Sequence, residues 1–429
     1  IFSSEWPVAN RVIELYLQKK SENGGWERQI NGISNNEKAV LLLEKRTFKE
    51  LLVDMELRNL QNNIVGQEAS RLFARAEINM GVEAFRDSLY SLLKRNTFLN
   101  IKFENMLDTL GEISRTDIRS LLGEWEKTTP LPFYSLGEPT LTKITNKGGE
   151  EFFVLKMLIS NNSDYDGIIH MDIRKDGWWY QPLEDPRAKT KIEMPAHTSK
   201  EFVSVWEDQI RNVEINTMVS GNLPNIISQD INNVKQERNK IVKDSIYILP
   251  ESSFDLPGEI IVDNEDSTLF ILSAPPIVGL LPKWLDEVEE TPFKYSGISW
   301  WRPPLQWTAT TNDRYYGKYI RSAFVIKSGD GSQTATWKVP VPEVGQYDLY
   351  YHVFKDDELR WNNNLQGEYH FKVKYGSEVE DAYINLRKAN EGWEQLGTYY
   401  FSADTVRVVL TDECKLRSVT ADAVKIVKR

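Results

Sequence analysis

Residues 328–354 read SGDGSQTATWKVPVPEVGQYDLYYHVF and hold the most informative pattern of the chain. Polar and apolar side chains alternate over residues 334–339 and again over 346–351. Alternation of this kind in runs rich in β-branched and aromatic residues is typical of half-buried β-strands. Pro342 and Gly345 lie between the runs and suit the backbone angles of a short turn. The stretch predicts two strands joined by a tight connection.

This stretch and the sequence after it resemble the golvesin/xanthan-lyase carbohydrate-binding-type module, a β-sandwich appended to secreted bacterial proteins. The resemblance is carried by the pattern W-x-x-L-G-x-Y-x-F at residues 393–401 and by A-D-A-V at residues 421–424. It covers about the last third of the chain. It implies a jelly-roll-like sandwich over residues 296–429 that binds a glycan or a protein.

The length of the chain limits the number of domains, and its net charge limits the classes of binding partner. The 429 residues are enough for two to four domains, because single hydrophobic cores stop growing at roughly 250–300 residues. The net charge of -11 argues against a nucleic-acid partner or an anionic membrane surface. No apolar run reaches the roughly 18 residues of a membrane-spanning helix. The sequence begins at Ile1 without an initiator methionine or a signal-peptide pattern, so we expect a piece of a longer polypeptide.

Residues 1–135 predict an α-helical domain. Apolar residues recur at spacings of three and four in stretches near residues 36–60, 66–80, 82–93, 103–110 and 118–125. A polar loop containing glycines is expected at residues 24–32. Helices with apolar stripes of this kind pack as a bundle, which would be a sufficient structural role for the domain.

The order of residues in this helical part resembles the end of the catalytic domain in zinc aminopeptidases of the aminopeptidase N family. Gly81 and Phe85 match a G-x-x-x-F helix, and Trp125 and Pro132 match the exit into a β-domain. Pro130 replaces the glycine that is usual at this exit. The segment VEINTMVSGNLP at residues 213–224 resembles the β-domain that follows in such proteins. The resemblance implies that the first two domains belong together.

Residues 136–255 predict a small antiparallel β-sandwich. Residues 152–159 and 167–173 are expected to pair across a turn, and further strands are expected at 201–206 and 211–219. The polar run 231–240 is interpreted as a helix or an exposed segment. Residues 256–295 are predicted to be a linker with a short helix near Trp284. The fold class is therefore multidomain α+β, an α-helical domain followed by two antiparallel β-sandwiches.

A zinc aminopeptidase needs the motif HExxH, which places two histidines and a general base on one helix face. The four histidines of the chain are His170, His197, His352 and His370, and none lies within four residues of another. We therefore expect neither a metal site nor a cofactor in these residues, and zinc only in a parent protein whose motif precedes Ile1.

Other catalytic patterns are missing from the sequence as well. It contains no G-x-S-x-G nucleophile elbow. Because the sequence has a single cysteine, Cys414, it cannot form an internal disulfide. Its acidic neighbours Asp412 and Glu413 disfavour a thiolate, so we expect a structural role. The acidic residues Asp356, Asp357 and Glu358 form a solvated loop that leaves calcium binding open.

Aromatic residues gather at the start of the last predicted domain. Sugar-binding modules present aromatic faces to pyranose rings, whereas aromatic residues in strands usually pack the core. Both interpretations stay open, and the prolines after Trp301 favour exposure of the two tryptophans before them. The candidate ligand-binding residues are Trp300, Trp301, Trp307, Tyr315, Tyr316 and Trp361.

Three functions are consistent with these patterns. The first is the non-catalytic C-terminal portion of a secreted or periplasmic bacterial aminopeptidase-like protein, whose last module binds a glycan or a cell-surface protein. The second is the supporting half of an active zinc metallopeptidase. The third is a structural spacer in a cell-envelope assembly. All three imply an extracytoplasmic location.

Overall fold

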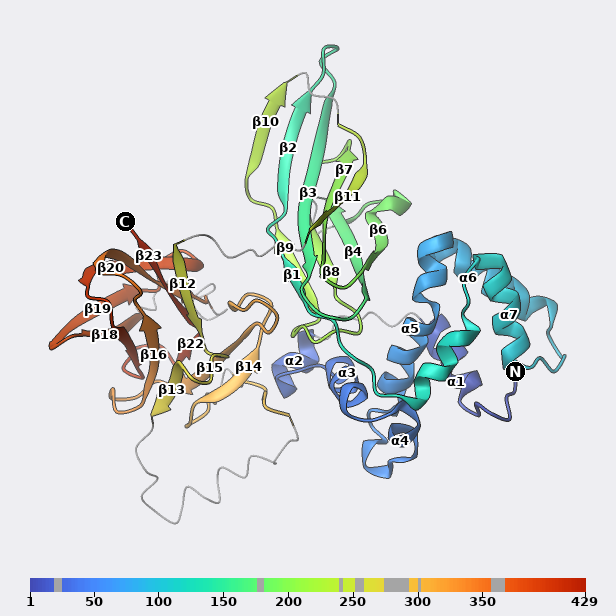
Figure 1. Ribbon diagram of the computed structural model, residues 1–429, viewed down its shortest axis with the longest axis horizontal. Helices are drawn as coiled ribbons and strands as arrows, with labels where there is room; N and C mark the ends of the chain where they lie inside the picture. The colour runs from blue at the N-terminus through green and yellow to red at the C-terminus, as the bar shows by residue number, and fades with distance from the viewer. Residues whose placement is uncertain are drawn as a thin grey trace. The chain divides into compact units, whose positions relative to one another are not determined.

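The computed structural model describes residues 1–18, 25–175, 181–238, 242–250, 258–273, 293–299, 302–355 and 367–429. The chain forms two compact units. The first comprises Ile1–Gly24 and Asn35–Phe254, and the second comprises Gly25–Ser34 and Asp255–Arg429. Each unit is described by itself (Figure 1).

The first unit begins with helices around a central helix, α5. The α-helices are α1 (Ala9–Leu17), α3 (Asn35–Lys45), α4 (Phe48–Val53), α5 (Gln61–Met80), α6 (Val82–Arg95) and α7 (Phe103–Ser114). Two 3-10 helices, η1 (Met55–Leu57) and η2 (Arg119–Glu126), complete the set. Helix α5 packs against α1, α3, α4, α6 and α7 (Figure 1). No helix in the described ranges combines the length and apolar character needed to span a bilayer.

The helical prediction differs from the structure in two places. The long helix expected over residues 36–60 is broken, because Thr47 starts a new helix with a capping box in which its hydroxyl and the Glu50 side chain each satisfy a backbone N–H. Residues 119–126 form a 3-10 helix rather than an α-helix. Most of the predicted apolar positions are nevertheless buried, and Trp125 packs edge-on against Phe48 with ring centroids 4.8 Å apart.

Two sheets follow the helices within the first unit. One has the order β10-β2-β3-β7-β11, with β1 paired to β3, and the other has the order β5-β4-β8-β9, with β6 paired to β4. The strands of the first sheet are β1 (Tyr134–Leu136), β2 (Thr140–Thr145), β3 (Glu151–Asn161), β7 (Thr198–Trp206), β10 (Val234–Arg238) and β11 (Ser245–Pro250). Those of the second are β4 (Gly167–Lys175), β5 (Gln181–Pro182), β6 (Lys189–Met194), β8 (Ile210–Asn216) and β9 (Ile226–Asp230), and a 3-10 turn, η3 (Pro186–Ala188), precedes β6.

Two predictions for this sandwich were wrong. Strands β3 and β4 do not pair with each other but lie in different sheets, and their inward residues, such as Leu155 and Met171, share one core. The polar run 231–240 was expected as a helix or an exposed segment; the helix was wrong, because the run contains β10, an exposed strand that pairs parallel to β2. Strand β10 is at the sheet edge and mostly exposed, so it lacks the apolar alternation that identifies a strand.

Buried polar contacts join the helices to this sandwich. The Lys191 ammonium of β6 forms an ion pair with the Glu77 carboxylate of α5, and both side chains are almost fully buried. The Tyr16 hydroxyl donates to the other Glu77 oxygen at 2.7 Å. The Glu37 carboxylate of α3 accepts the backbone N–H of Asn225 at 2.9 Å. The helical part and the first sandwich therefore form one structural unit.

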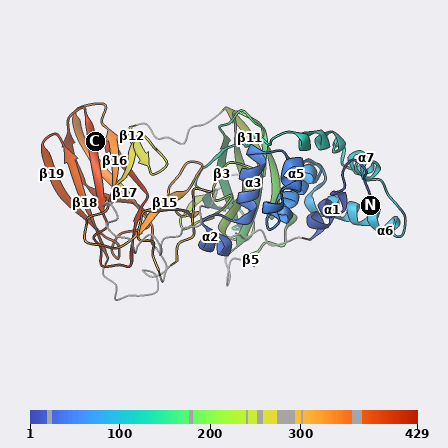
Figure 2. The ribbon, with the colours of Figure 1, turned by 90° about the horizontal axis from the view of Figure 1, so that it is seen from below.

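The second unit is a β-sandwich with an additional small sheet (Figures 1 and 2). One main sheet has the order β12-β23-β17-β20, and the other has the order β13-β16-β21-β18-β19. The first comprises β12 (Glu259–Asp263), β17 (Gly345–Val353), β20 (Gly392–Phe401) and β23 (Ala423–Lys428). The second comprises β13 (Phe270–Ser273), β16 (Thr334–Pro340), β18 (Glu368–Tyr375), β19 (Glu378–Asn385) and β21 (Thr405–Thr411). The small sheet contains β14 (Thr308–Thr311), β15 (Ser322–Lys327) and β22 (Ser418–Ala421).

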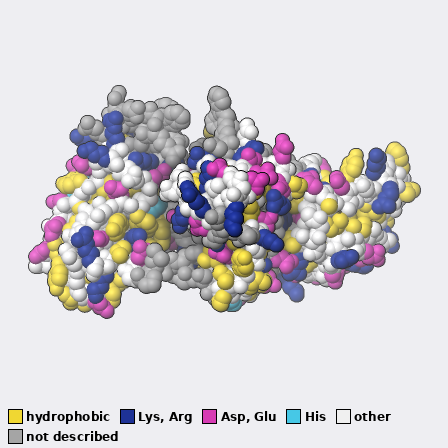
Figure 3. Space-filling model, turned by 90° about the horizontal axis from the view of Figure 1, so that it is seen from above, with side chains coloured by type: hydrophobic (Ala, Val, Ile, Leu, Met, Phe, Trp, Pro, Cys, Tyr) yellow, Lys and Arg dark blue, Asp and Glu magenta, His cyan; other side chains and the backbone are white. Residues whose placement is uncertain are grey.

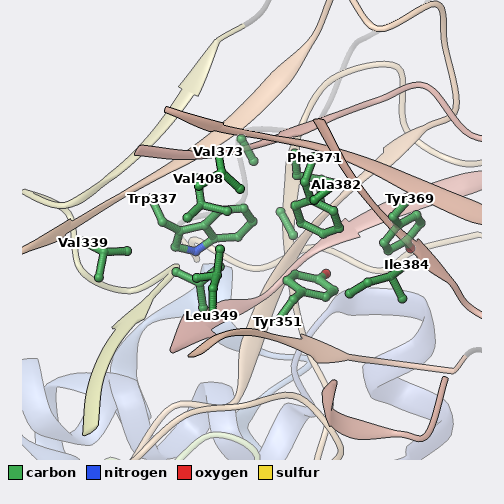
Figure 4. Close-up of a cluster of buried hydrophobic side chains, with 14 of the residues drawn as sticks. Trp337, Val339, Leu349, Tyr351, Tyr369, Phe371, Val373, Ala382, Ile384 and Val408 are labelled. Atoms are coloured by element: carbon green, nitrogen blue, oxygen red, sulfur yellow. The ribbon is translucent and has the colours of Figure 1, made fainter. Parts of the chain in front are cut away.

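The stretch 328–354 forms both predicted strands, β16 and β17. They do not pair with each other: β16 pairs with β13 and β21, whereas β17 pairs with β20 and β23. The proline–glycine connection therefore crosses from one sheet to the other. Figure 4 shows the result, in which Trp337 of β16 and Leu349 and Tyr351 of β17 meet in the core between the sheets. The predicted fold class, α+β with β-sandwich domains, is confirmed.

Two segments outside the predicted last domain belong to this unit. Strands β12 and β13 lie in the predicted linker 256–295 and pair with β23 and β16. The helix expected near Trp284 lies outside the described residues. Residues 25–31 form helix α2 (Gly25–Asn31) rather than a loop, and the Thr311 hydroxyl donates to the carbonyl oxygen of Gly32 at 2.5 Å. A Cβ at Gly297 would lie 1.9 Å from the carbonyl oxygen of Ile30, so only glycine allows this close approach.

Candidate functional site

The outer face of the sheet β12-β23-β17-β20 carries the candidate site. Along β17, the odd-numbered residues from Tyr347 to Val353 are buried and the even-numbered residues face outward. The register pairs Tyr350 with Gln395 and Lys425, and pairs His352 with Trp393. Because residues directly opposite each other on neighbouring strands share a face, these side chains form one surface. We call Tyr316, Tyr350, His352, Trp393 and Lys425 the aromatic face.

Three rings pack against one another at one end of this face. Tyr316, in the loop between β14 and β15, lies with its ring centroid 5.0 Å from that of Trp393. The His352 ring is 5.2 Å from Trp393 and 5.7 Å from Tyr316. All three side chains are partly exposed. Contacts at these distances and tilts favour one orientation of each ring.

Lys425 extends the aromatic face toward Tyr350. Its ammonium lies 4.9 Å from the Trp393 ring centroid and 5.3 Å from that of Tyr350. The same ammonium forms an ion pair with Glu259 of β12 at 2.9 Å. The cation thus lies between two aromatic rings and one carboxylate.

The buried carboxylate of Asp422 contacts two members of the aromatic face, Tyr316 and His352. It accepts the backbone N–H of Tyr316 at 3.1 and 3.2 Å and faces His352 Nδ1 at 2.9 Å. Burial raises the pKa of Asp422, and the facing His352 opposes that rise. Asp422 thus fixes both the loop that carries Tyr316 and the orientation of the imidazole.

A polar group lies beside the rings on the same outer surface. The Asp348 carboxylate accepts from Gln395 at 2.9 Å and from Arg429 at 2.9 Å, and its side chain also contacts the Thr398 hydroxyl at 2.5 Å. The Arg429 guanidinium, followed by the Thr398 hydroxyl, lowers the pKa of Asp348. An aromatic platform bordered by fixed carboxylate, amide and guanidinium groups can stack on an apolar ring face and hydrogen-bond to hydroxyl groups at its edge.

The structure places the predicted ligand-binding residues in different environments. Tyr316 belongs to the aromatic face. Tyr315 is only 6% exposed and packs against Phe354 with ring centroids 4.6 Å apart, which leaves little of its ring for a ligand. Trp307 is half-buried against the sandwich core. Trp300, Trp301 and Trp361 lie outside the described residues.

Sequence reasoning missed His352, Trp393 and Lys425 as members of a site. The signal was present, because alternation along residues 346–353 already divides inward from outward positions. It could not show which outward residues meet across strands, since those residues are more than 30 positions apart in the sequence.

The described residues contain no group of three or more histidine, cysteine, aspartate or glutamate side chains arranged to hold a metal ion. The acidic residues 356–358, considered for calcium, lie outside the described part of the chain. Burial raises the pKa of the Cys414 thiol, which disfavours its nucleophilic form.

Comparison with known proteins bears on this domain. Residues 303–428 match the family described as Golvesin C-terminal domain. The match contains every residue of the aromatic face: Tyr316, Tyr350, His352, Trp393 and Lys425. The golvesin-like domain thus agrees with the resemblance found in the sequence. The match does not include the helical part, whose resemblance to aminopeptidases stays a prediction.

Similarity to other proteins is weak. No curated protein matches the chain. A β-glucuronidase of Bacteroides uniformis is 12% identical over 73% of this chain and 31% of its own, with a TM-score of 0.19. A structure of Sulfolobus Turreted Icosahedral Virus is 11% identical over 71% of this chain and 96% of its own, with a TM-score of 0.15. Neither similarity bears on the fold or the activity of this chain.

Proposed function

We propose that the golvesin-like domain binds glycans through the aromatic face. The observation that supports this most is the Lys425 ammonium between the rings of Tyr350 and Trp393, with the Tyr316 ring packed against Trp393. Pyranose rings have an apolar face and polar edges, and a partly exposed aromatic surface bordered by polar groups complements both. The proposal concerns binding alone, since these residues do not form a nucleophile–base pair or a metal site.

The second unit also has a depression away from the aromatic face, and it is less suited to a sugar. It is a shallow depression of about 500 Å³ lined by Ile260, Pro340, Val341, Pro342, Ala403, Asp404 and Thr405. This lining offers no aromatic ring for stacking. We therefore assign the glycan to the aromatic face.

A glycan array followed by isothermal titration calorimetry on the 429-residue chain tests the proposal. Truncating a central aromatic of a binding surface costs about 2 kcal/mol or more, which is roughly a 30-fold loss of affinity. We expect this loss for Trp393→Ala. The matched control is Tyr383→Ala, which removes an exposed ring stacked on His370 on the outer face of the other sheet. Absence of glycan binding, or equal affinity of the W393A variant, would refute the proposal.

The other predicted roles remain proposals about a longer protein. The resemblance of the helical part supports a non-catalytic aminopeptidase-like portion, or the supporting half of a zinc metallopeptidase. The zinc motif would then be encoded upstream of Ile1, and the parent gene's sequence distinguishes these two roles. We also propose an extracytoplasmic location, which the resemblance of the last domain to modules of secreted bacterial proteins supports; fractionating cells that express the protein tests it.

A further inference from the structure

The connection between α6 and α7 presents two large apolar side chains to solvent. Phe98 is fully exposed at 102% and Leu99 is 64% exposed. The turn is closed by backbone hydrogen bonds from Thr97 to Lys94 at 3.3 Å and from Leu99 to Asn96 at 3.0 Å. Phe98 has a φ of +68°, a left-handed conformation that a bulky residue rarely adopts. Both side chains therefore lie on an ordered, hydrogen-bonded turn and project into solvent rather than into the helical core.

Basic residues flank this apolar tip on both sides. Lys94 and Arg95 end α6, Lys102 precedes α7, and all three side chains are exposed. Residues 88–103 contain no aspartate or glutamate. This segment is therefore positive within a chain whose net charge is -11.

Two more exposed aromatic residues lie near the tip. Tyr90 is one helical turn before Lys94, so both lie on the same face of α6. Phe2 is exposed and is held beside the connection by two backbone hydrogen bonds, from Phe2 to Ile101 at 3.1 Å and from Phe103 to Phe2 at 3.0 Å. At the right-hand end of Figure 3, hydrophobic side chains lie next to Lys and Arg side chains over the helical part.

We propose that residues 94–102 dock the protein on an anionic lipid membrane. In this interaction Phe98 and Leu99 enter the boundary between head groups and acyl chains, while Lys94, Arg95 and Lys102 contact anionic head groups. An apolar tip with a basic border matches this boundary in both polarity and charge. A nucleic acid could pair its phosphates with the basic side chains, but it offers little apolar surface to Phe98 and Leu99. The net charge of -11 argues against an anionic surface for the chain as a whole, but salt screens charges more than about 10 Å away at 0.1 M ionic strength, so the local basic border decides this contact.

Vesicle flotation of the 429-residue chain tests the proposal. The vesicles contain phosphatidylcholine with an equal part of phosphatidylglycerol, and phosphatidylcholine vesicles serve for comparison. We expect binding to the anionic vesicles that weakens with salt. Phe98→Ser with Leu99→Ser should reduce the partition coefficient at least about tenfold, because two apolar side chains no longer leave water. Lys94→Glu with Arg95→Glu should reduce it by a similar factor.

The control is Val53→Ser with Met55→Ser, which removes two exposed apolar side chains elsewhere on the helical part and should leave binding unchanged. A second measurement reports insertion directly: in a C414S background, an environment-sensitive dye attached to L99C should become brighter with anionic vesicles. Absence of binding by the unaltered chain refutes the proposal. Equal losses in the tip and control variants, or an unchanged dye signal, also refute it and leave a protein partner as the occupant of this surface.

Discussion

Replacing Lys191 with methionine would measure how strongly the helices are joined to the first sandwich. The ammonium of Lys191 pairs with the Glu77 carboxylate, and the two side chains are 11% and 4% exposed. Burial, and the neighbouring Glu77, raise the pKa of Tyr16, so its hydroxyl stays a neutral donor to that carboxylate. In the K191M variant the carboxylate keeps this one bond, remains buried and loses its cation.

The expected loss in the free energy of unfolding follows from the burial of the Lys191–Glu77 ion pair. Removing one partner of a buried ion pair costs about 3–5 kcal/mol, since the other charge is left uncompensated. With a urea dependence of about 2–3 kcal/mol per molar, the unfolding midpoint of the first unit should fall by about 1–2 M. The double variant K191M/E77L should recover most of this loss, because it removes both charges.

Arg75 and Glu193 provide a matched control on the same two elements. They lie on α5 and β6, are 3.9 Å apart, and are each about half exposed. Exposed pairs contribute about 0–1 kcal/mol, so R75M should shift the midpoint by less than about 0.5 M. Circular dichroism and tryptophan fluorescence would follow the transition. A shift for K191M no larger than that for R75M would refute the reasoning.

Two further predictions concern the second unit. Burial, and the nearby Asp422, raise the pKa of Asp263 to about 9. The folded state then keeps a proton that the unfolded state has released above about pH 4, so stability falls as pH rises toward 9, by up to about 1.4 kcal/mol per unit. D263N should remove this slope, measured as the melting temperature across that range, and a variant with an unchanged slope would contradict the assignment. Trp337→Ala should destabilise the domain by about 3–5 kcal/mol in urea unfolding, because the ring is fully buried and its N–H donates to the Asp422 carbonyl oxygen at 3.2 Å. W337F should retain more of the stability, and equal losses for the two variants would contradict a packing role.

The sequence was sufficient to predict strands but not their partners. Alternation over residues 334–339 and 346–351 is a local property of the backbone, so β16 and β17 were predicted correctly. Their assignment to opposite sheets depends on pairing with residues 405–411 and 423–428, which no local pattern encodes. The same limit explains β12, where a short apolar run between acidic residues looked like a linker until its pairing with β23 was known.

The site was predictable only in part for a related reason. Tyr316 was selected because it lies in an aromatic cluster of the sequence. Its neighbours Trp393 and His352 come from strands 40 or more residues apart. The buried Asp422, which contacts His352 and the Tyr316 backbone, appeared only as part of a family pattern. Cross-strand register, not composition, decides which aromatic residues meet.

The strand order β12-β23-β17-β20 has a consequence for folding kinetics. Strand β23 separates β12 from β17, and Ile260 pairs with Ile426 across 166 positions of sequence. Folding slows as the mean sequence separation of contacts grows, because each distant pair must close a long loop before it gains stability. The sheet that carries the aromatic face cannot be completed until residues 423–428 are available. The golvesin-like domain should therefore be the slower unit to refold, and the aromatic face should form in the final step of its folding.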